Sequence, residues 1–236
     1  VREAINETGH PALFLVDTIS GLASADYQHD AWGVDVTVTG SQKGLMLPPG
    51  LGFNCVSRKA LEAHEKSGFS KSYWDWGPML GNNANGFFPY TPATNLLFGL
   101  EEALKMLLDE EGLPQVFARH QRHAKATRIA VEHWGLEVLC QVEEEHSPVL
   151  TGVLLPDEHD ADHVRNVILD KFDMSLGTGL GKIKGKVFRI GHLGHLNDLT
   201  LMGTLSGVEM GLTLAGVQIK AGGCQAAMDY LRETAD

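Results

Sequence analysis

Two residues of opposite charge follow predicted strands that lie close together in the sequence. Asp17 ends the apolar run 12–16 (ALFLV), and Lys43 lies four residues past the alternating segment 34–39 (VDVTVT). Ligands of α/β proteins bind beyond the carboxyl ends of strands, so a carboxylate and an amine would line one pocket if these strands are neighbours. A neutral, buried amine condenses with an aldehyde, and a buried carboxylate keeps a pyridine nitrogen protonated, which suits pyridoxal phosphate. The alternative is an aspartate that caps a turn and a solvated lysine.

The segment around Lys43 carries a more specific pattern. Residues 41–50 read SQKGLMLPPG and directly follow VDTISGLASADYQHDAWGVDVTVTG. This stretch resembles the cofactor segment of the class V aminotransferases, which are fold-type I pyridoxal-phosphate enzymes, and it is nearest to their serine–glyoxylate and alanine–glyoxylate branch. The resemblance implies that Lys43 forms the Schiff base, that Asp17 pairs with the pyridinium nitrogen, and that Gln42 lies against the cofactor near its ring oxygen or phosphate.

A second segment continues the resemblance. Residues 87–104 (FFPYTPATNLLFGLEEAL) look like the family segment that enters the site of the neighbouring subunit. There Thr91 would help to hold the cofactor phosphate across a homodimer, and a family tyrosine could correspond to Phe88 or Tyr90. From the residues alone, Thr91 is equally well explained as a turn or helix-entry residue.

The third segment, 186–197 (KVFRIGHLGHLN), resembles the family's carboxylate-binding strand and implies that Arg189 binds the substrate α-carboxylate. A guanidinium suits this role because it makes two parallel charge-assisted hydrogen bonds to a planar carboxylate. The alternative is an exposed arginine on an alternating strand. We expect His192 and His195 to be packed or exposed rather than ligating.

The resemblance implies a ping-pong transamination in which serine gives its amino group to glyoxylate, forming hydroxypyruvate and glycine. An alanine–glyoxylate or related glyoxylate aminotransferase is the enzymatic alternative. The family's upstream half, with its phosphate loop, does not precede Val1. We therefore expect the C-terminal part of a longer protein, which alone binds the cofactor poorly. An inactive, truncated chain that acts as an interaction fragment is the non-enzymatic alternative.

The composition excludes several other classes. The 236 residues contain 43% hydrophobic side chains, 19 Lys and Arg, and 30 Asp and Glu, which gives a net charge of −11. This is a globular composition, and the acidic balance argues against nucleic-acid or anionic-membrane partners. Three widely spaced cysteines suit a reducing, cytoplasmic location, and Cys55 is expected to be buried. No metal site is expected, because His159 and His163 flank a predicted helix entry with Asp160 as its N-cap.

The residues that position these groups predict an α/β fold, which the resemblance specifies as the fold-type I transferase fold. The predicted elements are strands 12–16, 34–39 and 52–57, helix 58–67, a long ordered loop 69–93, helix 95–110 and a second helix ending near 134. Strands 136–142, 149–155 and 186–190, helix 161–172 and two C-terminal helices follow. We assign residues 1–114 to the C-terminal part of a large cofactor domain and 115–236 to a small α+β domain.

Overall fold

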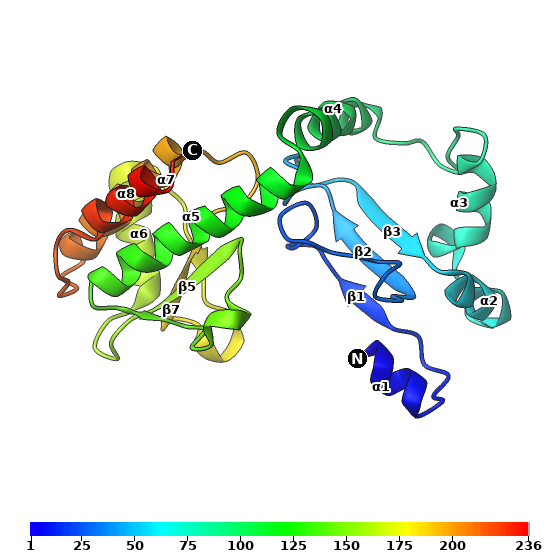
Figure 1. Ribbon diagram of the computed structural model, residues 1–236, viewed down its shortest axis with the longest axis horizontal. Helices are drawn as coiled ribbons and strands as arrows, with labels where there is room; N and C mark the ends of the chain where they lie inside the picture. Colours follow the sequence, from blue (N-terminus) through cyan, green and yellow to red (C-terminus); the bar gives the residue numbers. More distant parts are fainter. Residues whose placement is uncertain (236) are drawn as a thin grey trace. The chain divides into compact units, whose positions relative to one another are not determined.

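The computed structural model describes residues 1–235 (Figure 1). The chain divides into two compact units, Val1–Glu111 and Gly112–Asp236. The assignment of these units to a large and a small domain stays a prediction. Among the described residues, no helix is both long enough and apolar enough to cross a membrane.

The first unit is built on a three-stranded sheet of order β1-β2-β3, made of β1 (Leu15–Asp17), β2 (Val36–Gly40) and β3 (Gly52–Val56). β1 is parallel to β2, and β3 is antiparallel to it. Strands β2 and β3 lie where they were predicted, whereas β1 shares only Leu15 and Val16 with the predicted strand 12–16. A continuous apolar run such as 12–16 is typical of a strand that is covered on both faces, but β1 is an edge strand and Leu15 is 62% exposed. Cys55 on the opposite edge strand is likewise exposed rather than buried.

A buried carboxylate holds the start of this sheet. Asp35 is 4% exposed, forms an ion pair with Arg2, and accepts hydrogen bonds from the Phe14 N–H (2.8 Å) and the Ser57 hydroxyl (3.1 Å). Burial alone would raise the pKa of Asp35, but these hydrogen bonds and Arg2 lower it below the usual value. Asp35, which directly precedes β2, thus holds the segment before β1 and the residue after β3 to the start of β2.

Helices α1 (Arg2–Glu7), α2 (Arg58–Lys66), α3 (Trp76–Asn83) and α4 (Thr94–Lys105) complete this unit, and a π-helical turn, Met106–Glu111, continues α4. The predicted long loop at 69–93 is wrong in part, since it contains a 3₁₀ turn (Ser72–Trp74) and α3. Asp75 caps α3 by accepting from the Gly77 N–H, and Pro78 lies in the first turn, where a proline is tolerated.

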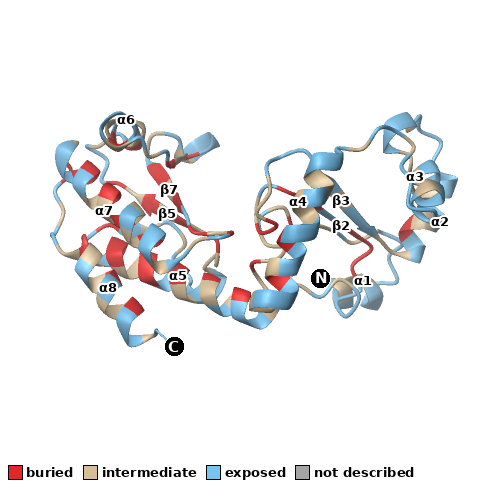
Figure 2. Ribbon diagram, turned by 90° about the horizontal axis from the view of Figure 1, so that it is seen from above, coloured by how far each residue is buried: buried red, intermediate tan, exposed pale blue. Residues whose placement is uncertain are grey.

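The second unit is a four-stranded antiparallel sheet of order β4-β5-β7-β6 with helices packed on one face (Figure 2). Its elements in chain order are α5 (Leu113–His133), β4 (Glu137–Val138), β5 (Leu150–Leu154), α6 (Ala161–Phe172), β6 (Gly177–Thr178), β7 (Val187–Gly191), α7 (Asp198–Leu214) and α8 (Gly223–Glu233). The predicted strand 136–142 is therefore much shorter than expected. Phe188 and Ile190 of β7 are completely buried in the core with Ile168 of α6 and Leu205 of α7.

One carboxylate connects the helices of this unit. Glu209 of α7 accepts hydrogen bonds from Trp134 Nε1 (2.8 Å), the Gly222 N–H (2.9 Å) and the Cys224 N–H (2.8 Å). Although burial raises its pKa, the hydrogen bonds from Gly222, Trp134 and Cys224 lower the pKa of Glu209 to about 2. A carboxylate that is charged at neutral pH thus holds the end of α5 and the start of α8 to α7.

Candidate active site

The parallel pairing of β1 and β2 places Asp17 and the segment that carries Lys43 at the same end of the sheet, where the carboxyl ends of both strands lie. Asp17 is the last residue of β1 and pairs with Val38, and β2 ends at Gly40, three residues before Lys43. The next residue of the chain, Thr18, donates its N–H to the Val38 carbonyl (2.9 Å). The two strands are therefore neighbours, and both run toward this end, which is the condition for a shared pocket.

Asp17 is exposed, although a carboxylate that keeps a pyridine nitrogen protonated is expected to be buried. One oxygen, Oδ1, accepts a hydrogen bond from the Ile19 N–H (2.9 Å), so the side chain does cap the turn after β1. The second oxygen forms no hydrogen bond within residues 1–235. Asp17 thus combines a local structural role with a carboxylate oxygen that is free to meet a cationic ligand atom.

Lys43 lies in a tight turn that a buried serine holds together. Ser41 is fully buried, its hydroxyl donates to the Pro48 carbonyl (2.7 Å), and it accepts from the Leu51 N–H (3.2 Å). The turn is closed by the Met46 N–H, which donates to the Lys43 carbonyl (2.9 Å). Lys43 itself is half-buried, and its amine has no hydrogen bond or ion pair in the described part of the chain.

The turn packs closely against the residues that follow Asp17. A Cβ at Gly44 would lie 2.1 Å from the Leu22 carbonyl oxygen and 2.6 Å from Ser24 Oγ. Ser24 is 1% exposed, and its hydroxyl has no partner among residues 1–235. The turn of Lys43 and the segment after Asp17 are therefore in direct contact, with an unpartnered buried hydroxyl beside them. No pattern in the sequence indicated Ser24.

Gln42 and Thr91 are both exposed. The Gln42 side chain lies over the end of β2, since a Cβ at Gly40 would lie 2.7 Å from Gln42 Oε1. Thr91 lies three residues before α4 begins at Thr94, which also fits a helix-entry residue. The roles of Gln42 and Thr91 toward a cofactor stay predictions.

Arg189 belongs to the second unit and lies in the middle of β7. Its neighbours Phe188 and Ile190 point into the core, so the alternation of the strand directs Arg189 to the opposite face of the sheet. The side chain is half-buried, and the Nε atom is buried without any partner within the described residues. A guanidinium held in this way, with no carboxylate partner among the described residues, is suited to an anionic ligand.

The histidines after Arg189 are packed or exposed, as predicted. His192 is fully buried between Thr151 Oγ1 (2.9 Å from Nε2) and the Pro148 carbonyl (3.1 Å from Nδ1), while His195 is exposed. Burial lowers the pKa of His192 to about 4. This ring is therefore neutral at physiological pH and serves the packing of the sheet.

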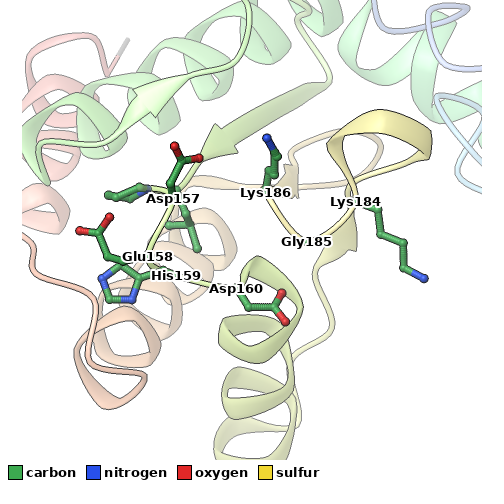
Figure 3. Close-up of a pocket in the computed structure, with 9 residues that line it drawn as sticks. Asp157, Glu158, His159, Asp160, Lys184, Gly185 and Lys186 are labelled. Atoms are coloured by element: carbon green, nitrogen blue, oxygen red, sulfur yellow. The ribbon is translucent and has the colours of Figure 1, made fainter.

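The other candidate groups form no catalytic arrangement. Asp160 caps α6 by accepting from the Asp162 N–H (2.8 Å), as predicted, and residues 1–235 contain no cluster of metal-ligating side chains. Figure 3 shows the pocket at this helix entry, which is lined by residues 157–160 and 184–186, with the Lys184 side chain directed away from the other labelled residues. Because both signs of charge are present, the pocket has no clear preference for an anion or a cation.

The chain is similar to one family of enzymes over most of its length. The family model "Aminotransferase class-V" matches residues 2–180. The serine–glyoxylate aminotransferase of Methylorubrum extorquens is 46% identical over 99% of this chain and 59% of its own length. The L-aspartate–glyoxylate aminotransferase of Paracoccus denitrificans is 43% identical over 99% of this chain and 59% of its own.

A solved structure gives the same result for the fold. The pyridoxamine–pyruvate aminotransferase of Mesorhizobium loti superposes with a TM-score of 0.89 at 28% identity, over 99% of this chain and 60% of that one. The chain thus spans about three fifths of the length of the proteins that it matches.

Proposed function

The chain belongs to the class-V aminotransferases, and from that premise we propose that it forms part of a pyridoxal-phosphate enzyme that transfers the amino group of serine to glyoxylate. The products are hydroxypyruvate and glycine. The observation that carries the proposal is the parallel pairing of β1 and β2, which brings the carboxylate of Asp17 and the turn of Lys43 to one end of the sheet. The likeness to the serine–glyoxylate enzyme of Methylorubrum extorquens supports this choice of substrates.

The residues at this end of the sheet fit the cofactor chemically. Within residues 1–235, Lys43 offers a half-buried amine that has no partner. Asp17 offers a carboxylate oxygen that forms no hydrogen bond there. Lys43 would hold pyridoxal phosphate covalently, Asp17 would hold its ring nitrogen, and Gln42 and Thr91 would contact its ring oxygen or phosphate. When bound, the cofactor supplies an electron-withdrawing ring that stabilises negative charge at the α-carbon of the amino acid.

Each of the proposed site residues then has a distinct role. Arg189 binds the α-carboxylate of the amino acid, and afterwards that of glyoxylate, through paired hydrogen bonds. Lys43 would also remove the α-proton of the amino acid as a general base and return a proton as a general acid. Asp17 keeps the ring nitrogen protonated because its negative charge favours the cationic form. Serine would give its amino group to the bound cofactor in the first half of the cycle, and glyoxylate would receive that group in the second.

The amino donor is the least constrained part of this proposal. Alanine is the alternative that the sequence pattern left open, and the relative in Paracoccus denitrificans is named for L-aspartate at nearly the same identity. Glyoxylate is the amino acceptor in all of these alternatives. We further propose that the full-length protein is a cytoplasmic homodimer, as the family resemblance implies. The net charge of −11 supports the proposal that it binds neither nucleic acid nor anionic membranes.

The proposal is tested by following glycine formation from glyoxylate with serine, alanine or aspartate as the donor, in the longer protein of which this chain forms part, loaded with pyridoxal phosphate. The expected result is the highest kcat/KM with serine, and no turnover in Lys43→Ala. A higher kcat/KM with another donor would overturn the choice of serine. No glycine with any donor would overturn the proposal, and irregular association of the 236-residue chain in light scattering would favour the inactive-fragment alternative.

A further inference from the structure

Arg189 has a glycine beside it on each neighbouring strand. Gly152 of β5 and Gly177 of β6 are the residues that pair with it across β7. Side chains at paired positions of a sheet lie on the same face, within contact distance of one another. Both positions beside the Arg189 side chain therefore lack a side chain of their own.

The arginine side chain occupies the space over only one of these glycines. A Cβ at Gly177 would lie 3.1 Å from Arg189 Cβ, 3.1 Å from its Nε and 3.5 Å from its Cζ. On the other side, a Cβ at Gly152 would meet Leu139 instead, with Cβ at 3.1 Å and Cδ2 at 3.3 Å. The base of the guanidinium thus lies over Gly177, where its Nε is buried.

Strand β6 is only two residues long, and side chains of α6 hold it in place. The Thr178 hydroxyl donates to Asp162 Oδ1 (2.9 Å), and Arg165 Nε donates to the Leu176 carbonyl (2.9 Å). Arg165 also donates to the same Asp162 oxygen (2.8 Å). The residues on both sides of Gly177 are therefore anchored to one helix, so Gly177 cannot easily move away from the arginine.

We propose that Gly177 is a positioning residue for carboxylate binding, with the Thr178–Asp162 hydrogen bond holding it beneath Arg189. The inference rests on the proposed role of Arg189 as the ligand of the substrate carboxylate. Paired hydrogen bonds between a guanidinium and a carboxylate are directional. A methyl group at position 177 would displace Nε and Cζ and so weaken carboxylate binding, without touching the groups that move protons at Lys43.

The test uses glycolate, which has the carboxylate of glyoxylate but no carbonyl group that could accept an amine. Calorimetric binding of glycolate to the cofactor-loaded protein is measured beside KM and kcat. We expect Gly177→Ala to weaken glycolate binding and raise KM by about tenfold, the contribution of one hydrogen bond to a charged group, with little change in kcat. Gly203→Ala is the matched control, because a Cβ at this exposed position of α7 meets nothing within 4 Å.

A double-mutant cycle separates positioning from a general structural effect. In an Arg189→Ala background, Gly177→Ala should weaken glycolate binding no further, because its effect acts through the arginine. Thr178→Val removes the hydroxyl that donates to Asp162 Oδ1 (2.9 Å) and to the Gly179 carbonyl (3.1 Å), and it should weaken glycolate binding by roughly threefold. This variant decides the question if Gly177→Ala does not fold.

The outcomes distinguish a failure of the proposed role of Arg189 from a failure of the proposed role of Gly177. If Arg189→Ala binds glycolate as well as the parent protein does, the proposed role of Arg189 is wrong. If Arg189→Ala weakens binding while Gly177→Ala and Thr178→Val do not, only the role of Gly177 is overturned. Additive effects of Gly177→Ala and Arg189→Ala would also overturn it.

Discussion

Gly44 lies directly against the carbonyl oxygen of Leu22, so that a Cβ at position 44 would come within 2.1 Å of this atom. Gly44 follows Lys43, and Leu22 belongs to the segment that follows Asp17. The contact is between backbones and leaves no room for adjustment by a flexible side chain. It holds the turn of the lysine against the loop of the aspartate, and with the pairing of β1 and β2 it defines the candidate active site.

The first prediction concerns this contact. Gly44→Ala should lower the free energy of unfolding by about 2 kcal/mol or more, because the methyl group forces the two backbone segments apart. Gly21→Ala in the same loop is the control, since its Cβ meets nothing within 4 Å. Urea denaturation measures both. Equal midpoints for the two variants would show that the turn and the loop are not packed as described.

The second prediction separates the charge of Asp17 from its capping role. Asp17→Asn keeps an oxygen that can accept from the Ile19 N–H, so the fold should be retained. The variant cannot stabilise a protonated ring nitrogen, and kcat should fall by roughly 100-fold or more. Steady-state kinetics beside thermal melting check this. A stable variant with unchanged kcat would remove Asp17 from the mechanism.

The third prediction is a pH dependence of stability. Burial lowers the pKa of His192 from 6.5 to about 4, so the unfolded chain binds a proton in this range that the folded protein does not. The stabilisation that neutral His192 provides is complete above about pH 6.5. It is lost as the pH falls from there toward about 4. Between about pH 7.5 and about pH 5 the protein should lose roughly 2 kcal/mol from this group.

The measurement for His192 compares urea midpoints at these two pH values in the parent protein and in His192→Asn. The variant should show a smaller loss, while His123, whose pKa burial also lowers, contributes equally to both proteins. An identical pH dependence in the parent and the variant would contradict the assignment.

The fourth prediction concerns the carboxylate that joins the helices of the second unit. Glu209→Gln places an amide where Trp134 Nε1 and two backbone N–H groups donate, and loses a hydrogen-bonded charge. The free energy of unfolding should fall by about 2 kcal/mol. Glu144→Gln, at an exposed position, should change it little. Calorimetric melting of both variants is the check, and equal melting temperatures would contradict the role of Glu209.

Much of the α/β architecture was predictable because local patterns and tertiary packing agree. Ser57 and Asp160 cap α2 and α6 as side-chain acceptors, and Gly135 follows α5 with a positive φ, so these helix ends could be placed from single residues. The structural match at a TM-score of 0.89 confirms the fold-type I class. Helix α3 was missed because glycine, proline and asparagine weaken its local signal, while its cap depends on Asp75.

The site was predictable only as residue types at strand ends. The order of β1 and β2 in the sheet, the contact of Gly44 with Leu22 and the unpartnered Ser24 hydroxyl all depend on tertiary placement. The exposure of Asp17 could not be inferred either, because an apolar run before an aspartate is the same for a covered and an uncovered strand. The glycines beside Arg189 required the strand register.

The central claim is that the Lys43 amine carries the cofactor. Protein loaded with pyridoxal phosphate and active with serine and glyoxylate is reduced with borohydride, which makes the bond between lysine and cofactor permanent. The modified peptide is then located by mass spectrometry. The account predicts the added mass on Lys43 and its loss when serine is present before reduction. Added mass on another lysine, or an unmodified Lys43 in active protein, would contradict it.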